Sequence, residues 1–159
     1  MTGCPELARQ TLLLIADLIS GLSQQIRKIE IELMKWHRAD AVCQRLETIP
    51  GIGFITATAL AATVNNARAF RSGRQFSAWL GLVPKQHSSG GKERLGAISK
   101  TGDLYLRHLL VVGATAVLRY TKRKATKVRL VTVALANKIV RIAWAVMARG
   151  ETYRATATA

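Results

Sequence analysis

The sequence predicts an all-α fold, in which a long N-terminal coiled-coil helix precedes a compact helical domain. Apolar residues recur at helical spacing near the N-terminus, and further apolar segments of helical length follow. Glycine and proline separate these segments, and no β-rich stretch runs for more than a few positions. Hydrophobic residues make up 49% of the 159 residues, which is ample for one core. We expect an assembly helix over 1–45 and a helical domain over 46–159.

The first element is a long helix with an apolar seam. Seam residues are separated by three or four positions and average one every 3.5 residues, the period of a coiled coil. They are Ile15, Leu18, Leu22, Ile26, Ile29, Leu33 and Trp36. Such a seam packs on the helix's own domain, or forms an antiparallel hairpin or a dimer contact, and the sequence does not choose between these. We expect a homo-oligomer formed through this helix.

The second element is a pair of helices joined by the turn 50–53, within LETIPGIGFITATALAATV. One helix ends over 46–49, and the next covers 56–64. The pattern is similar to a helix-hairpin-helix motif, in which glycines such as Gly51 and Gly53 let the backbone approach a phosphate. Such contacts bind the nucleic-acid backbone without reading bases. The alternative is a plain turn between two helices, because PGIG is a short pattern.

A short helix is expected next. Ser72 is a good N-cap for it, and it should bury Phe76, Trp79 and Leu80 and end near Gly81. Its exposed side should carry three arginines at a spacing of three, which either extend an anion-binding surface or form a solvated face. These are Arg68, Arg71 and Arg74.

Two longer helices complete the chain. One begins near 101–102, and the other runs from about Val128 to Gly150, a typical residue after a helix end. A basic connector over 122–129 separates them. Leu82 and Val83 form at most a short extended piece.

The charge is strongly positive and unevenly distributed. Lys and Arg number 24 against 9 Asp and Glu, giving +15, and residues 1–47 are neutral with six of each sign. The whole excess therefore lies in 48–159, where self-repulsion destabilises the fold unless a polyanion neutralises it. Nucleic acid is the usual polyanion. A solvated basic surface is the weaker alternative, and a membrane surface is not expected because the cations do not share one amphipathic face.

No metal site or cofactor is expected in this chain. Residues 48–159 contain only Glu93, Asp103 and Glu151 as carboxylates, too few for a two-metal site. Cys4 and Cys43 have neither zinc nor disulfide spacing, and the N-terminus does not resemble a signal peptide, so a cytoplasmic setting is expected. If the chain cuts or joins nucleic acid, the nucleophile has to be a side chain.

The loop KQHSSGGKERLG, residues 85–96, supplies candidate nucleophiles in Ser88 and Ser89. A serine hydroxyl that attacks a phosphodiester forms a covalent phosphoserine link, and cations stabilise the anionic transition state. The cations near the serines in sequence are Lys85, Lys92, Arg94 and Lys100, with His87 as a possible proton shuttle. The alternative is a Ser/Gly linker with lysines for solubility, and composition makes it at least as plausible.

From Leu46 to Arg154 the chain resembles the C-terminal transposase domain of the insertion-sequence one-ten family. The similar stretches are IPGIGFITATAL, FRSGRQFSAWLGLVPKQHSSGGKERLGAISKTGDLYLRHLL and VALANKIVRIAWAVMARGETYRA. The resemblance implies a serine recombinase of prokaryotic mobile elements, nucleoid-associated, with DNA and a structured guide RNA as partners. It implies Ser89, which precedes two glycines, as the nucleophile, with Ser88 as the alternative.

The same resemblance implies a separate N-terminal RuvC-like domain, whose DEDD carboxylates bind Mg²⁺. We expect this sequence to lack that domain, and to be shorter than the family pattern between 120 and 128. The candidate nucleic-acid contacts are Gly51, Gly53, Arg71, Arg74, Lys85, His87, Lys92, Arg94, Lys100 and Arg107. Two alternatives remain open: a non-catalytic, basic helix-hairpin-helix module, and an inactive transposase remnant.

Overall fold

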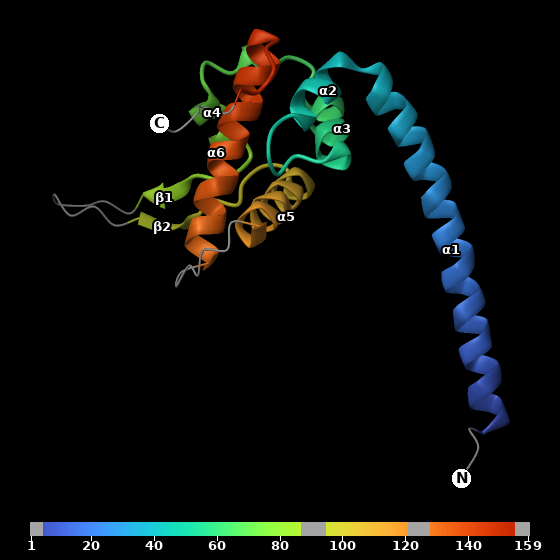
Figure 1. Cartoon of the computed structure of the whole chain (residues 1–159). Coiled ribbons are helices and arrows are strands. Elements are labelled where there is room, and N and C mark those ends of the chain that lie inside the picture. The colour runs from blue at the N-terminus through green and yellow to red at the C-terminus, as the bar shows by residue number, and fades with distance from the viewer. Residues whose placement is uncertain (1–4, 87–94, 121–127, 155–159) are drawn as a thin grey trace. The chain divides into compact units, whose positions relative to one another are not determined.

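The computed structural model describes residues 5–86, 95–120 and 128–154, and it confirms the all-α fold (Figure 1). Six α-helices, one 3₁₀ turn and two short strands cover the described residues. The chain divides into two compact units, residues 1–36 and 37–159. The boundary expected at 45 falls inside the helix α2 (Ala41–Glu47), which packs against α3 (Phe54–Thr63) in the second unit.

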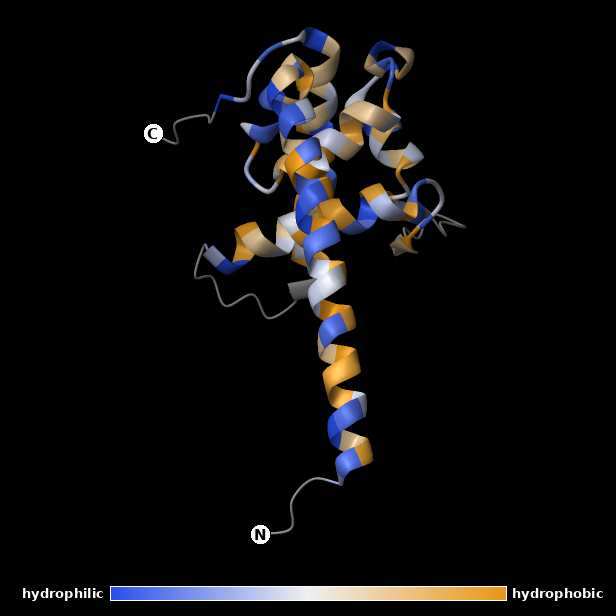
Figure 2. Ribbon diagram, turned by 90° about the vertical axis from the view of Figure 1, so that its right-hand side faces the viewer, coloured by the Kyte–Doolittle hydropathy of each residue, from blue (hydrophilic) through white to orange (hydrophobic). Residues whose placement is uncertain are grey.

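The helix α1 (Glu6–Ala39) is the predicted long N-terminal helix. Glu6 lies in its first turn, where it accepts hydrogen bonds from Arg9 at 3.0 and 3.1 Å. Six of the seven seam residues are exposed, among them Leu18 at 66% and Leu22 at 58%, and Leu33 is half-buried. Apolar and polar residues both line this helix in Figure 2. Among the described residues, most of this apolar seam is therefore exposed.

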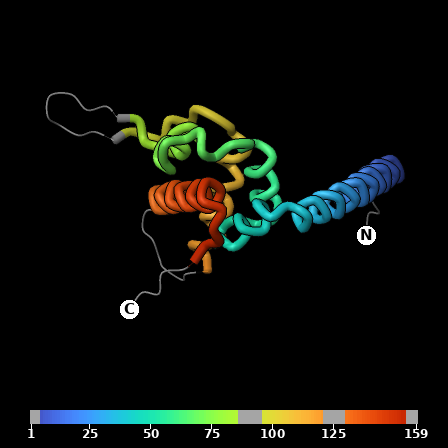
Figure 3. Tube along the Cα trace, turned by 90° about the horizontal axis from the view of Figure 1, so that it is seen from above, coloured from blue at the N-terminus to red at the C-terminus, as the bar shows by residue number. Residues whose placement is uncertain are grey.

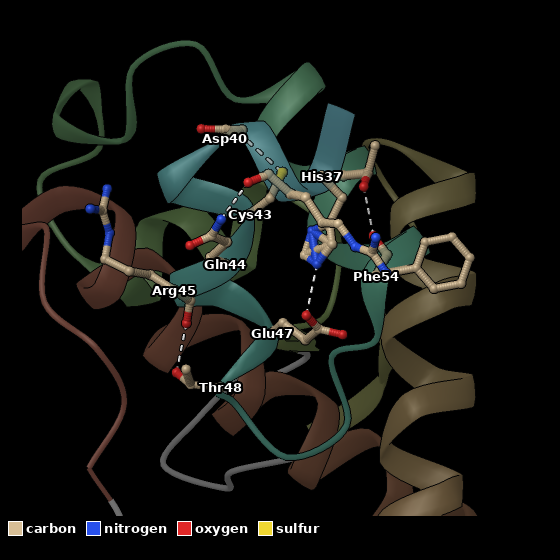
Figure 4. A network of polar contacts seen from close by, with 10 residues as sticks. His37, Asp40, Cys43, Gln44, Arg45, Glu47, Thr48 and Phe54 are labelled. Atoms are coloured by element: carbon tan, nitrogen blue, oxygen red, sulfur yellow. Dashed lines mark hydrogen bonds and ion pairs between the residues drawn. The ribbon is translucent and has the colours of Figure 1, made fainter. Parts of the chain in front are cut away.

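A break at Asp40, which the sequence pattern does not indicate, separates α1 from α2. Asp40 is the N-cap of α2, and its side chain accepts from the backbone N–H of Val42 at 2.9 Å. Beside it, the Nε2 atom of the buried His37 lies 2.7 Å from the Oε2 atom of Glu47 (Figure 4). An aspartate side chain satisfies a free N–H group at the start of a helix, so α2 begins as a separate helix here.

The helix α3 starts two residues before its predicted start. Gly53 is its N-cap and offers no side-chain hydrogen bond to the first turn. The turn before it is tight, because the N–H of Ile52 donates to the carbonyl of Ile49 at 3.0 Å. Both isoleucines are buried, at 4% and 1% exposure, and they anchor the turn in the core.

The helix α4 (Gly73–Trp79) confirms the predicted short helix, with Ser72 accepting from Gln75 as N-cap. The 3₁₀ turn η1 (Ala67–Ala69) precedes it. The expected burial of Trp79 is wrong, since 40% of this residue is exposed. Its indole lies on the surface side of Phe76, with ring centroids 5.7 Å apart and planes at 18°, and covers this fully buried ring.

The strands β1 (Pro84–Gln86) and β2 (Leu95–Ile98) pair antiparallel, with Pro84 opposite Ile98. The register is irregular between Pro84 and Gln86. The sequence predicts only a short extended piece near this point. The two strands therefore form the stem of a hairpin that carries the connection 87–94, and we call them the hairpin stem.

The helices α5 (Leu104–Tyr120) and α6 (Val128–Arg149) complete the domain and confirm the two predicted C-terminal helices. Asp103 caps α5 through the N–H of Leu106 at 2.8 Å, and Gly150 ends α6 at a φ of 72°. α6 packs on both α4 and α5 (Figure 3). The core shared by these helices includes Phe76, Leu80, Leu106, Leu110, Ala136, Val140 and Ala143.

Among the described helices, one segment is long and apolar enough to cross a membrane by composition alone. It is Leu130–Arg149, with a mean hydropathy of 1.6. Lys138 and Arg141 lie near its middle, where a bilayer makes charges costly. This segment is the part of α6 that packs on α4 and α5, as a core helix does.

Candidate nucleic-acid interface

The predicted nucleophiles Ser88 and Ser89 lie in 87–94, outside the described residues, together with His87, Lys92 and Arg94. The structure does describe the stem on either side of them. At its base, the N–H of Ser99 donates to the carbonyl of Val83 at 2.9 Å, and that of Lys100 to Gly81 at 3.2 Å.

Two predicted cations, Lys85 in β1 and Lys100 just after β2, are exposed on this stem. Lys100 has a φ of 56°, in the left-handed region where a side chain is strained. The surrounding hydrogen bonds at the stem base hold it there. Both lysines are therefore available to an anion near the serine loop.

Arg107 departs from its expected role as a nucleic-acid contact. Only 8% of it is exposed, and its Nη1 atom donates to the carbonyls of Leu80 at 3.1 Å and Thr101 at 3.3 Å. A buried guanidinium bound to backbone carbonyls fixes the loops that flank the stem. Arg107 therefore supports the stem from α5, and a direct phosphate contact does not fit its burial.

Two glycines let those loops meet. Gly81 has a φ of 73° and Gly102 a φ of 92°. A Cβ on Gly81 would lie 2.0 Å from the carbonyl oxygen of Thr101, and one on Gly102 would lie 1.9 Å from that of Trp79. No larger residue fits either position, so the stem base is a close contact between two backbones.

Asn137 is a further support that the sequence does not single out. Its Nδ2 atom donates to the carbonyl of Leu82 at 3.1 Å, from a distance of 55 residues along the chain. The sequence does contain one signal for this contact, a polar asparagine within the apolar pattern of α6. A buried polar side chain needs a hydrogen-bond partner. The base of the stem is thus held by side chains of both α5 and α6.

The two glycines of the turn 50–53 differ in their surroundings. Gly51 has a φ of 92°, and a Cβ there would lie 3.1 Å from the carbonyl oxygen of Gly113 and 3.0 Å from Ile139. Gly53 has no atom within 4 Å of that position. Gly51 therefore allows close packing of the turn against α5 and α6. The Cβ position of Gly53 is open, so a phosphate could approach the backbone there.

The arginines Arg71 and Arg74 are exposed around α4, as predicted. Arg74 also lines a groove of about 1380 Å³ between the start of α4, α6 and the segment 150–154. Four further cations line it, and the sequence does not group them because they come from segments far apart. They are Lys138, Arg141, Arg149 and Arg154.

Neither metal ligation nor a cysteine nucleophile finds support in the described part of the chain. Within it, no three His, Cys, Asp or Glu side chains come together as a cation site. Burial, followed by the hydrogen bond and negative charge of Asp40, raises the pKa of Cys43 to about 12. The thiolate that a nucleophile requires is therefore scarce at neutral pH.

A helical domain with a cluster of cations around α4 and α6 has the electrostatic pattern expected of a nucleic-acid-binding protein. Residues 43–129 match the family model described as Transposase IS116/IS110/IS902 family. This range is more than half of the chain and includes the hairpin. The chain belongs to the IS116/IS110/IS902 transposase family, which confirms the resemblance found in the sequence.

Relatives extend the match beyond that range. A putative transposase of Sinorhizobium fredii, y4pF/y4sB, is 45% identical over 94% of this chain and 42% of its own length. The transposase for insertion sequence element IS1111A of Coxiella burnetii is 42% identical over 94% of this chain and 44% of its own length. A pilin gene-inverting protein of Moraxella bovis is 28% identical over 70% of this chain and 37% of its own length. The chain thus spans less than half the length of these relatives.

Proposed function

We propose that this chain is the strand-exchange portion of a DNA transposase, with Ser89 as the nucleophile and Ser88 as the alternative. The observation that carries the proposal is the position of the serine loop, which lies inside the family match and on a stem held from α5 and α6. A rigid support positions a nucleophile better than a free loop does. This role places the protein in the bacterial cytoplasm, at the nucleoid.

In the proposed step, the serine Oγ atom attacks the phosphorus of a DNA phosphodiester. An Oγ–P bond forms, the bond from phosphorus to one deoxyribose oxygen breaks, and that oxygen leaves with a proton. The phosphoserine ester keeps the bond energy for religation to another strand. Negative charge grows on the phosphoryl oxygens, and cations such as Lys85 and Lys100 would stabilise it.

DNA is the proposed substrate, and a structured guide RNA is a proposed second partner. The turn 50–53 would act as a helix-hairpin-helix contact, with the N–H groups after Gly53 directed at a phosphate. Its two helices are present and the N-cap position is open, which supports this role. Mg²⁺ would belong to a RuvC-like domain and is assigned to no residue of this chain.

The experiment is covalent capture on DNA that carries a nicked or strained junction. The purified chain is incubated with labelled DNA and resolved on a denaturing gel, beside Ser89→Ala and Ser88→Ala. We expect a protein–DNA band that Ser89→Ala removes and Ser88→Ala keeps. The reverse pattern would assign the nucleophile to Ser88. A band that survives both substitutions would overturn serine chemistry in this loop.

The second candidate is a non-catalytic nucleic-acid-binding module, and the unpaired cations of the groove favour it because they need no nucleophile. It predicts a shift on a native gel without any covalent band. In that case the serine loop would be a linker, and the chain either a binding module or an inactive remnant. A chain that only aggregates when expressed would point to the remnant.

A further inference from the structure

Five cations that form no ion pair within the described ranges line one groove: Arg74, Lys138, Arg141, Arg149 and Arg154. We call it the α6 groove. Its lining contains one carboxylate, Glu151, against these five cations. A groove with this balance favours an anion that touches several cations at once.

The cations of α6 lie on one face of the helix. Taking Lys138 as zero, Arg141 lies at about 300° and Arg149 at about 20° around a helix of 3.6 residues per turn, so the three share an arc of roughly 80°. The opposite face is in the core and includes the fully buried Val140 and Ala143. The helix is therefore divided between a core face and a cationic face.

These charges have no internal compensation. The five cations make no ion pair and no side-chain hydrogen bond within the described ranges, and α6 contains no Asp or Glu. By contrast, the exposed cations Arg9 and Lys35 of α1 pair with Glu6 and Glu32. A merely solvated helix face usually mixes both signs, as α1 does. The α6 groove instead concentrates one sign, and its self-repulsion calls for an external anion.

The walls and floor of the groove are fixed. A Cβ on Gly73 would lie 3.1 Å from the backbone of Arg141, so α4 starts directly against α6. The ring N–H of Trp144 donates to the carbonyl of Ala67 at 3.0 Å, which holds this lining residue in place. The backbones of α4 and α6 therefore form the groove before a ligand arrives, and binding orders only the cationic side chains.

The length of the cationic face suits a nucleic-acid strand. From Lys138 to Arg149 the helix advances about 16 Å at 1.5 Å per residue. Phosphates of one strand follow about every 3.4 Å along a duplex axis, so this length faces roughly five of them. One end of the groove contains Asn137, which bonds to Leu82 beside the hairpin stem. A strand lying in the groove would thus lead to the base of the stem.

We propose that the α6 groove binds the phosphodiester backbone of one nucleic-acid strand, independently of base sequence, as a tract separate from the serine loop. This groove adds a second contact surface to the proposed function. The proposal rests on that function, which makes DNA the expected strand. The phosphate chemistry is the same for DNA and RNA, and the experiment distinguishes them. The residues that carry it are Arg74, Lys138, Arg141, Arg149 and Arg154.

The test is the salt dependence of binding by the 159-residue chain. The triple variant Lys138→Gln, Arg141→Gln, Arg149→Gln is compared with Arg27→Gln, Lys28→Gln, Lys35→Gln on α1, which removes the same charge. Each is titrated with duplex DNA, single-stranded DNA and single-stranded RNA over a range of salt concentrations.

Loss of three phosphate contacts should lower the slope of log K against log salt by about 2.7 for duplex and about 2.1 for single strands. The nucleic acid whose affinity falls most in the Lys138, Arg141 and Arg149 variant is identified as the natural ligand of the groove. The α1 control should keep the wild-type slope. Equal slopes and affinities in both triple variants would overturn the proposal.

A footprint on the wild-type chain keeps the proposal testable if the triple variant folds poorly. Lys138 and Lys28 are acetylated with and without nucleic acid and quantified by mass spectrometry. We expect protection of Lys138 and none of Lys28, and equal labelling of Lys138 in both states would contradict the proposal.

Failure of the serine proposal would look different. In that case covalent capture is absent or survives both Ser89→Ala and Ser88→Ala, while the groove variant still lowers the salt slope.

Discussion

At the scale of single residues, a tightly constrained contact lies between Gly51 and Gly113. A Cβ on Gly113 would lie 1.9 Å from the carbonyl oxygen of Gly51, so the two backbones touch directly. The turn 50–53 and the helix α5 therefore meet backbone to backbone at this point. Gly51 cannot be replaced without disturbing the fold, so it is a poor position at which to test phosphate binding.

Replacing Gly113 with Ala should destabilise the domain, because the added methyl group meets a backbone oxygen that cannot move aside. We expect the free energy of unfolding to fall by about 1–3 kcal/mol, in spite of the better helix propensity of Ala. Denaturation in urea measures this change.

Gly53→Ala is the comparison variant, since its Cβ position is open and its cost is limited to the poorer N-cap preference of Ala, about 0.5–1 kcal/mol. It should lose less stability than Gly113→Ala and bind DNA more weakly. A Gly113→Ala variant as stable as the wild type would show that the close contact does not exist in solution.

The limits of the sequence are also clearest at single residues. Arg107 has the charge of a nucleic-acid contact, but its partners Leu80 and Thr101 are backbone carbonyls that only the fold brings to it. The cations of the α6 groove lie up to 80 positions apart in sequence, from Arg74 to Arg154. The positive charge of these residues is visible in the sequence. Which of them are buried, and which lie together in one groove, depends on tertiary packing.

At the scale of elements, helix ends with local signals were predictable. Ser72 and Gly150 mark the start of α4 and the end of α6 because capping is decided within a few residues. The break at Asp40 was hidden, since Cys43 and Leu46 continue the apolar spacing of the seam beyond Trp36. The hairpin stem was also missed, because strands of three and four residues are too short to show a period.

The exposed seam of α1 predicts self-association. Apolar residues such as Leu22, at 58% exposure, and Ile29, at 60%, gain stability when a second copy covers them. We expect the chain to sediment as an oligomer and the variant Leu22→Lys, Ile29→Lys to sediment as a monomer.

The control Gln24→Lys, Gln25→Lys adds the same charge off the seam and should remain an oligomer. A wild-type chain that is monomeric at high micromolar concentration would reject this role for α1.

At the scale of the whole molecule, the dominant feature is a net charge of +15 that comes entirely from residues 48–159. The Lys and Arg ion pairs of the described residues involve Glu6 and Glu32, both in the neutral first part of the sequence. The basic part therefore folds against its own repulsion, and a bound polyanion should relieve it.

Duplex DNA should accordingly raise the thermal stability of the chain. A ligand that binds only the folded state adds about 2.7 kcal/mol when its free concentration is roughly a hundred times Kd. Differential scanning fluorimetry measures the shift, which added salt should diminish as it weakens binding. An uncharged polysaccharide at the same mass concentration is the control, and an equal shift with both would indicate crowding and not charge.

The helix α5 joins the base of the hairpin stem to the turn 50–53 and fixes the distance between them. Arg107 holds the base of the hairpin stem, and Gly113, six residues later, receives the turn 50–53. The two attachment points are therefore about 9 Å apart along the axis and fixed in angular phase. One residue inserted between them would rotate one point by about 100° relative to the other. The length of this short interval is therefore under tighter constraint than the identity of most residues within it.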